Sequence, residues 1–230
     1  MAAPVSSVRP IVVHHLNNSR SQRILWLLEA LNIKYEMKKY MRDSKTMRAP
    51  KELTQVHPLG KSPVITDGDL VVAESGAIVE YLVGTYGQGK LIPQPGTPER
   101  LNYTFWLHFA EGTAMTPVLL ALLFTKIKTD SPFFVRPITS AISNTVFSSF
   151  ITPEINKNAD FMESELSKHE WFAGSEFTAA DIQMSFPVEA MASRGGIKQR
   201  CPKLMAWLDR IHATPTYKKA LEVGGEYSIL

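Results

Sequence analysis

The chain has 230 residues, 44% of them hydrophobic and 20% charged, which is enough for one large or two modest domains with a sizeable core. A formal net charge of +3, carried by scattered basic residues, argues against nucleic-acid binding. The single cysteine, Cys201, excludes an internal disulfide and fits a reducing compartment. Because residues 1–7 lack the pattern of a secretory signal and the apolar run at 118–124 is too short to span a bilayer, we expect a cytoplasmic protein without a membrane partner.

The first ninety residues alternate between strand-like and helix-like patterns. The expected elements, in chain order, are a strand at 9–15, a helix at 19–31, a strand at 34–40, a short helix from Ala49-Pro50, strands at 64–65 and 70–73, and a helix over 78–86. Asp67-Gly68-Asp69 between the last two strands indicates a hairpin. A mixed sheet of about four strands with helices on its faces satisfies this order best.

After residue 87 the pattern becomes almost entirely helical. Residues 88–97 are rich in Gly and Pro and are typical of a linker. Pro117 is expected to kink the first long helix beyond it, and the TAAD sequence at 178–181 resembles a capping box with Asp in place of Glu. We therefore predict an α/β domain at 1–87 and an all-helical domain at 98–230.

Ser62-Pro63 is the first candidate binding feature. A proline that enters a strand cannot donate a ladder hydrogen bond. If its peptide bond is cis, the backbone N–H and C=O of Ser62 can face solvent at a sheet edge and pair with an extended peptide ligand. A single such dipeptide more often only begins a strand.

Glu74-Ser75 is the second candidate, because it follows a predicted strand directly and starts a helix. Backbone N–H groups at a helix N-terminus attract anions. The Ser75 hydroxyl could hold a carboxylate while Glu74 pairs with an amine, which suits the α-amino acid end of a ligand. Taken alone, the dipeptide is more simply an ordinary helix cap.

The turn at 17–21 (NNSRS) is the third candidate. It places hydroxyl and amide donors at the N-terminus of the first predicted helix, where they could stabilise a thiolate or another anion. Ser and Asn are also among the commonest helix caps, so capping is the competing interpretation.

Taken together, these three segments and the order of the predicted elements resemble the glutathione transferases. The resemblance covers nearly the whole chain. HPLGKSPVI at 57–65 is similar to the family's cis-proline motif, and AESGAIVEYL at 73–82 to the start of its next helix. FTAADI at 177–182 and CPKLMAWLDRI at 201–211 are similar to its helix-capping motif and penultimate helix. The NNSRS turn is most similar to that of a fungal and bacterial subgroup.

The resemblance implies a thioredoxin-like N-terminal domain with a mixed four-stranded sheet and a helical C-terminal domain. It also implies a detoxifying homodimer that uses glutathione as co-substrate, needs no metal, and acts on a small-molecule electrophile or peroxide. The alternatives are a glutathione-dependent peroxidase or disulfide reductase, and a non-catalytic glutathione-binding regulatory protein.

The resemblance assigns roles to five residues of the candidate binding segments. Ser62 would pair its backbone with the cysteinyl part of glutathione, with Pro63 in a cis peptide bond. Glu74 and Ser75 would hold the γ-glutamyl end, and Lys61 would reach the glycine carboxylate as a point charge.

The sulfur donor is less clearly assigned. Much of the family uses a Tyr, Ser or Cys after the first strand, but this chain has no Tyr in the first strand or its turn and no Cys in this half. The absence of a cysteine argues against a mechanism through mixed disulfides with the enzyme. The matching position falls on Asn18, with serines at Ser19 and Ser21, and the order of preference is Ser19, Asn18, Ser21.

The electrophile would lie against the first long helix of the second domain. Candidates for its binding are Tyr103, Trp106, Glu111 and Met115, for each of which ordinary core packing is an equal alternative.

Three further residues carry reactive side chains. Strand alternation should turn one of His14 and His15 inward and the other outward, and neither is expected to be catalytic. Cys201 is expected to be a buried structural thiol.

Overall fold

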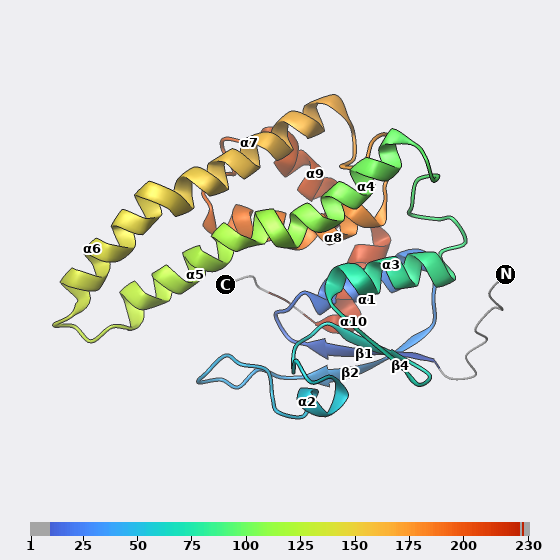
Figure 1. The fold of residues 1–230 in the computed structure, drawn as a ribbon, viewed down its shortest axis with the longest axis horizontal. Coiled ribbons are helices and arrows are strands. Elements are labelled where there is room, and N and C mark those ends of the chain that lie inside the picture. The colour runs from blue at the N-terminus through green and yellow to red at the C-terminus, as the bar shows by residue number, and fades with distance from the viewer. Residues whose placement is uncertain (1–9, 226, 228–230) are drawn as a thin grey trace. The chain divides into compact units, whose positions relative to one another are not determined.

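The computed structural model describes residues 10–225 and residue 227 (Figure 1). It divides into two compact units, which we describe separately. The first runs to residue 94 and continues from 212 onward, and the second covers 95–211.

The first unit contains a four-stranded sheet with the order β2-β1-β3-β4. Its elements in chain order are β1 (Ile11–Leu16), α1 (Ser21–Leu31), β2 (Tyr35–Tyr40), α2 (Leu53–Val56), β3 (Val64–Asp67), β4 (Leu70–Ala73), α3 (Ser75–Tyr86) and α10 (Pro215–Gly224). β1 and β2 are parallel, and the other two pairs are antiparallel. The mixed sheet and the order of strands and helices are as predicted.

Both histidines of β1 are buried, whereas alternation predicted one outward side chain. They do use different partners: His14 Nδ1 lies 2.9 Å from the Tyr40 hydroxyl, and His15 contacts α1. The strand is interior to the sheet, and Leu53 of α2 packs on Leu16 and Tyr40. Because helices cover both faces of β1, alternation here does not expose a side chain.

The predicted extent of the helical domain, 98–230, is wrong at its end, because α10 packs in the first unit. Trp26 of α1 donates its Nε1–H to Thr216 Oγ1 over 3.1 Å, and its ring meets Tyr217 edge-to-face at a centroid separation of 5.1 Å. Gly224 allows close approach, since a Cβ there would lie 2.9 Å from Leu25 Cδ1. A helix-period pattern shows which face is apolar but not which domain covers it.

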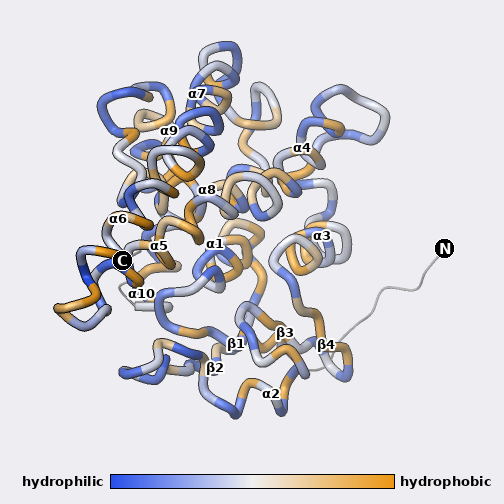
Figure 2. Tube along the Cα trace, turned by 60° about the vertical axis from the view of Figure 1, so that its left-hand side comes forward, coloured by the Kyte–Doolittle hydropathy of each residue, from blue (hydrophilic) through white to orange (hydrophobic). Residues whose placement is uncertain are grey.

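The second unit is built from helices and their connections, with an isolated β-bridge between Trp171 and Gly174 among the described residues. Its α-helices are α4 (Pro98–Phe109), α5 (Met115–Asp130), α6 (Arg136–Val146), α7 (Thr152–Lys168), α8 (Ala179–Arg194) and α9 (Pro202–Ala213). π-helical turns at Ala110–Ala114 and Phe147–Ile151 join α4 to α5 and α6 to α7. Hydrophobic residues recur along α1 of the first unit and α8 of the second (Figure 2), and α8 is buried from Ala179 to Ala192.

A π-helical turn at Ala110–Ala114 lies just before Pro117, where the sequence predicted a kink. Pro117 has no N–H, so it cannot donate to the carbonyl of Thr113 four residues earlier. Asn158 of α7 supplies a donor instead, with its Nδ2 lying 3.3 Å from that carbonyl oxygen. A side chain from a neighbouring helix thus satisfies the acceptor that the proline leaves open.

The run Pro98–Asp130 is long and apolar enough to cross a membrane by length and composition. Inside the protein, 44% of its most apolar window is buried. Core helices of soluble proteins pass the same test, so this run is weak evidence for a membrane span.

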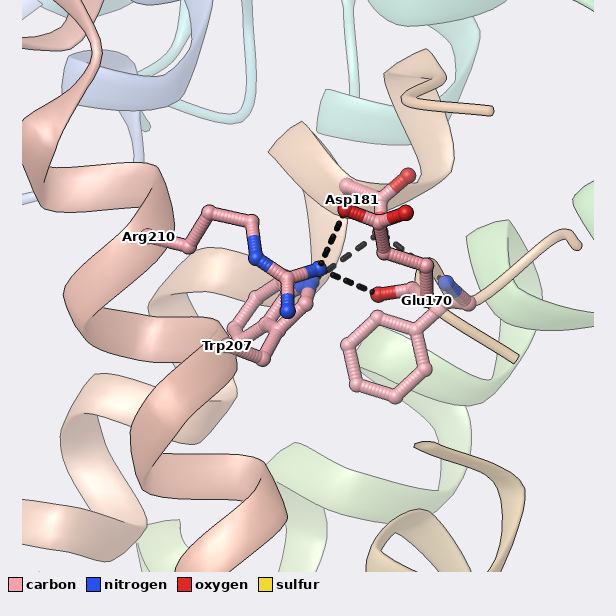
Figure 3. A network of polar contacts seen from close by, with 5 residues as sticks. Glu170, Asp181, Trp207 and Arg210 are labelled. Atoms are coloured by element: carbon pink, nitrogen blue, oxygen red, sulfur yellow. Dashed lines mark hydrogen bonds and ion pairs between the residues drawn. The ribbon is translucent and has the colours of Figure 1, made fainter. Parts of the chain in front are cut away.

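The predicted capping box at the start of α8 is present, and the side chain of its Asp181 lies beside Trp207 (Figure 3). The fully buried Asp181 carboxylate accepts the backbone N–H groups of Phe172 and Thr178, at 3.0 and 2.9 Å, together with the Thr178 hydroxyl and Trp207 Nε1–H, both at 3.1 Å. Burial raises the pKa of Asp181 to about 6, although all four hydrogen bonds act to lower it. Nearer the surface, Arg210 donates to the Glu170 carbonyl over 2.8 Å.

Candidate active site

The candidate binding segments of the first unit meet at one end of the sheet. In the β1–β3 ladder His14 pairs with Val64, so the register places Leu16 opposite Ser62 just beyond the last pair. Two hydrogen bonds support this placement: Ser62 Oγ donates to the His14 carbonyl over 2.8 Å and accepts the Leu16 N–H at 3.3 Å.

The register of β3 and β4 brings the two predicted dipeptides together. Val64 pairs with Ala73, so the preceding Ser62-Pro63 lies opposite the following Glu74-Ser75. The Ser62–Pro63 peptide bond is cis, as predicted. The expectation of a sheet edge is wrong, because β3 lies between β1 and β4. Ser62 instead precedes the first paired residue of β3, so it lies beyond the end of the ladder rather than along its edge.

Glu74 and Ser75 differ sharply in exposure. Glu74 is exposed and has φ 72° and ψ 126°, a backbone conformation that costs a non-glycine residue of the order of 1–3 kcal/mol and is common at functional sites. Ser75 is buried and is the first residue of α3. Its hydroxyl accepts a hydrogen bond from Arg23 Nη2 at 3.1 Å.

Arg23 is a site residue that the sequence reasoning missed. Only 1% of its surface is exposed, which is unusual for an arginine. It lies one helical turn before Leu27 on the buried face of α1. A charged residue at a buried position of an otherwise apolar stripe was the signal in the sequence that could have identified it. A buried guanidinium beside Ser75 adds positive charge to the N-terminus of α3, so both favour an anion there.

Arg42 donates hydrogen bonds to the turn at 17–21 and is a second site residue that the sequence reasoning missed. Arg42 donates its backbone N–H to Asn17 Oδ1 at 2.7 Å, its Nε–H to the Asn17 carbonyl and an Nη2–H to the Asn18 carbonyl, both at 3.1 Å. Asn18 has φ 49°, in the left-handed region that Asn tolerates better than most residues. No pattern around Arg42 pointed to this role.

His15 of β1 forms a hydrogen bond with Ser21 at the end of the same turn. The Ser21 hydroxyl lies 2.9 Å from His15 Nδ1 and 2.7 Å from Ser19 Oγ. Burial, with a smaller contribution from Lys39, lowers the pKa of His15 to about 4, so its ring is neutral at pH 7. Ser21 is completely buried and Ser19 is 4% exposed, whereas Asn18 is half-buried.

Lys61 is exposed and precedes Ser62 directly. Gly60 before it has φ 57°, and a Cβ at that position would lie 2.7 Å from Thr54 Cγ2. Only glycine fits both the left-handed backbone and this approach to α2, and it fixes the path of the chain into Lys61-Ser62.

The four electrophile candidates lie in the second unit. Tyr103, Trp106 and Met115 are buried, and Glu111 is half-buried in the first π-helical turn. The Trp106 ring packs among three phenylalanines, with centroid separations of 4.5 Å to Phe172, 5.0 Å to Phe109 and 5.4 Å to Phe161. Core packing therefore accounts for Trp106. π-helical turns are frequent at functional sites, which keeps Glu111 as a candidate.

Together, the end of the sheet presents chemistry suited to a zwitterionic peptide. The N-termini of α1 and α3, with Arg23, favour negative groups, while the exposed Glu74 can pair with an amine. Within residues 10–225, no group of three or more His, Cys, Asp or Glu side chains could hold a metal ion.

Comparison with known proteins agrees with this arrangement. Residues 10–84 match the glutathione S-transferase N-terminal domain, and residues 152–215 match the glutathione S-transferase C-terminal domain. Glutathione S-transferase 3 of Schizosaccharomyces pombe is 37% identical over 92% of this chain and 87% of its own length. The chain belongs to the glutathione S-transferase family.

Solved structures of glutathione S-transferases share this fold. A glutathione S-transferase from Actinobacillus pleuropneumoniae aligns with a TM-score of 0.77 and 34% identity, covering 93% of this chain and 92% of that one. A glutathione transferase of Phanerochaete chrysosporium, solved in complex with oxidised glutathione, aligns with a TM-score of 0.74 over 96% and 98% of the two chains. At 22% identity, the latter shows the fold alone. The N-terminal match spans β1 to most of α3 of this transferase and so contains the three candidate binding segments of the first unit.

Proposed function

We propose that the first unit of this transferase binds glutathione at the end of its sheet, promotes ionisation of the thiol, and directs the thiolate at a small-molecule electrophile. The supporting observation is the strand register, which brings Ser62-Pro63, Glu74-Ser75 and the turn after β1 to one place. The sequence suggested each of these segments separately, and each alone has an ordinary structural explanation.

The roles follow from the chemistry of each group. The backbone of Ser62, held beyond the ladder next to Pro63, would pair with the cysteinyl part of glutathione as an added strand does. Glu74 would bind the amino group and Ser75 the carboxylate of the γ-glutamyl end. Lys61 would reach the glycine carboxylate as a mobile point charge.

Ionisation of the thiol is the chemical task of the turn at 17–21. A free cysteine thiol has a pKa of roughly 8.5, and only its thiolate is a strong nucleophile. A donor at the N-terminus of α1 favours the charged form, and the released proton passes to solvent. With a chloronitrobenzene, a carbon–sulfur bond then forms and chloride leaves with the electron pair of the broken bond.

Glutathione binding is tested most simply at Ser75. Ser75→Ala removes one hydrogen bond to a charged group, so calorimetry should show glutathione affinity lowered about tenfold to a hundredfold. Ser143→Ala is the matched control, because Ser143 is an equally buried serine on α6 whose hydroxyl bonds the Phe124 carbonyl. Equal affinities of the two variants would contradict the assignment of Ser75.

The reaction is tested with a chloronitrobenzene and an organic hydroperoxide side by side. Turnover of the chloronitrobenzene supports conjugation. Turnover of the hydroperoxide alone would assign a glutathione-dependent peroxidase instead, and glutathione binding without either turnover would assign a binding protein.

Glu111 and Met115, at the π-helical turn and the start of α5, are the proposed electrophile contacts. Tyr103 and Trp106 are more deeply buried than Met115, at 1% and 2% exposed against 7%, and would act by supporting these contacts. Glu111→Gln and Met115→Ala should change the KM for the electrophile more than that for glutathione.

We also propose a cytoplasmic homodimer without nucleic-acid or membrane partners. Leu119, Leu123 and Ile127 form an exposed apolar row along α5, which supports association of two copies. The buried free thiol of Cys201 supports a reducing compartment. Light scattering would measure the mass in solution.

A further inference from the structure

Two consecutive carbonyl groups of the turn after β1 point at the guanidinium of Arg42. The Asn17 carbonyl accepts the Arg42 Nε–H and the Asn18 carbonyl accepts an Nη2–H, both at 3.1 Å. A third nitrogen of the same side chain, Nη1, donates to the Met47 carbonyl at 3.0 Å. Because the guanidinium is a planar fork with donors at fixed angles, this one side chain fixes the orientation of two peptide groups.

The peptide group between Asn18 and Ser19 has its N–H on the side opposite to Arg42. In a trans peptide bond the C=O and the N–H point in nearly opposite directions, and this bond is trans, since the cis bond among the described residues is Ser62–Pro63. The Asn18 carbonyl points to the side of β2, because Arg42 lies two residues beyond the end of that strand. The Ser19 N–H therefore points away from β2, toward the side of β1 on which β3 lies.

This N–H is a backbone donor without an acceptor in the described part of the chain. Among residues 10–225 and 227, nothing accepts a hydrogen bond from the Ser19 N–H. Ser19 is only 4% exposed, and roughly nine in ten or more buried backbone N–H groups are paired. Its neighbours Asn18 and Arg20 are half-buried, so the turn reaches the surface at this point. An acceptor supplied by a ligand would satisfy the donor.

The Ser19 hydroxyl, in contrast, is bonded within the turn. It lies 2.7 Å from Ser21 Oγ and accepts the Ser21 N–H at 3.2 Å. Ser21 Oγ in turn lies 2.9 Å from His15 Nδ1. The hydroxyl is thus part of the structure of the turn, whereas the Ser19 N–H can bind a ligand without a change in any of these bonds.

The side of β1 to which the Ser19 N–H points is also the side of the proposed cysteinyl subsite. Ser62 precedes β3 and lies opposite Leu16, whose N–H donates to the Ser62 hydroxyl at 3.3 Å. Under the proposed function, the backbone of Ser62 pairs with the cysteinyl part of glutathione, which carries the sulfur. The donor and the sulfur are therefore brought to the same end of the sheet by the two segments that meet there.

We propose that the backbone N–H of Ser19 donates the hydrogen bond that stabilises the glutathione thiolate, and that Arg42 is the positioning residue that orients it. The guanidinium also polarises the peptide group whose carbonyl it binds, which strengthens the N–H as a donor. A backbone donor that is fixed in advance needs no reorganisation when charge develops on the sulfur. This inference rests on the proposed function and names a donor in the turn other than its side chains.

The first test separates the N–H of Ser19 from its hydroxyl. Incorporation of the α-hydroxy acid analogue of serine at position 19 replaces the amide with an ester, which removes the N–H and keeps the side chain. The pKa of the bound glutathione thiol, titrated by thiolate absorbance, should rise by about one unit, a tenfold loss of thiolate at pH values below the wild-type pKa. Ser19→Ala keeps the N–H and should raise this pKa by less than half as much. An equal or larger rise in Ser19→Ala would overturn the proposal.

The role of Arg42 is tested by comparing Arg42→Met with Arg48→Met. Arg48 is exposed in the same loop, so its substitution removes the same charge without freeing the carbonyls of the turn. Arg42→Met should raise the thiol pKa by about half a unit or more and lower kcat more than it changes the KM for glutathione. A purely structural role would lower the folded fraction without moving the thiol pKa of the folded protein. Equal thiol pKa values in the two variants would overturn the role of Arg42.

The two changes should also be coupled. In the ester background, Arg42→Met should add little to the thiol pKa, because the donor that it orients has been removed. Full additivity of the two pKa shifts would overturn the proposed link between Arg42 and the Ser19 N–H.

Failure of the proposed function would be recognised separately. If calorimetry shows that the wild-type protein does not bind glutathione, the proposed function itself fails. If glutathione binds with a lowered thiol pKa and the ester variant keeps that pKa, only the assignment of the Ser19 N–H fails.

Discussion

Each unit of the molecule contains a buried polar cluster, and the two clusters are built differently. In the second unit, four donors converge on Asp181, and every bond ends inside the fold. In the first unit, hydrogen bonds link His15 to Ser21 and Ser21 to Ser19 within the turn that carries the half-buried Asn18. The converging cluster stabilises its own unit, whereas the row of bonds in the first unit lies at the proposed glutathione site.

The largest expected effect is on stability in the converging cluster. Asp181→Ala leaves four buried donors without their acceptor and should cost about 3 kcal/mol or more of the free energy of unfolding. Chemical denaturation would measure the loss, with the exposed Asp209→Ala on the neighbouring α9 as the control. Glutathione affinity of the folded fraction should stay near the wild-type value. A large fall in glutathione affinity in a fully folded Asp181→Ala variant would contradict the view that this cluster acts only on stability.

The two clusters should respond to pH in opposite directions. The pKa of His15 is lowered to about 4, so its contribution to stability is complete above about pH 6.5 and is lost as pH falls toward 4. The pKa of Asp181 is raised to about 6, so its contribution is present near pH 4 and is lost as pH rises through 6.

Substitution of His15 should therefore separate the two contributions. In the wild-type protein the Asp181 contribution opposes that of His15 between pH 4 and 6.5, where the His15 part is on the order of 3 kcal/mol and the lowered pKa of His14 acts in the same direction as that of His15. His15→Asn should therefore lose less stability than the wild-type protein as pH falls across this range. Unfolding curves of wild type and variant that stay parallel in pH would contradict the assignment.

A smaller effect on stability is expected for a second hydrogen bond within the helical unit, between Asn158 and the Thr113 carbonyl. Asn158→Ala leaves the Thr113 carbonyl without its side-chain donor and should cost about 1–2 kcal/mol. Pro117→Ala restores a backbone N–H four residues after Thr113, so Asn158→Ala should cost less in that background. A double-mutant cycle by denaturation measures the coupling, and strict additivity would show that the two residues do not share this carbonyl.

The sequence predicted the framework better than the details of the site. The order of elements and the capping box follow from local patterns, hydrophobic period and turn chemistry, and the structure has both. The three binding segments were found because each begins or ends an element. Their proximity could not be derived locally, since it depends on the pairing of β1 with β3.

The residues that sequence reasoning missed act across the fold. Arg42 reaches back 24 and 25 residues to the carbonyls of Asn18 and Asn17, and no local pattern records that contact. The placement of α10 in the first unit depends on contacts of Trp26 with residues 190 or more positions further along the chain.

The most direct test of the central claim is the pKa of the thiol of glutathione bound to the wild-type protein, measured by the pH dependence of thiolate absorbance. If the end of the sheet binds glutathione with its sulfur at the turn after β1, this pKa should fall at least one unit below the roughly 8.5 of a free cysteine thiol. Bound glutathione with an unshifted thiol pKa would contradict the account.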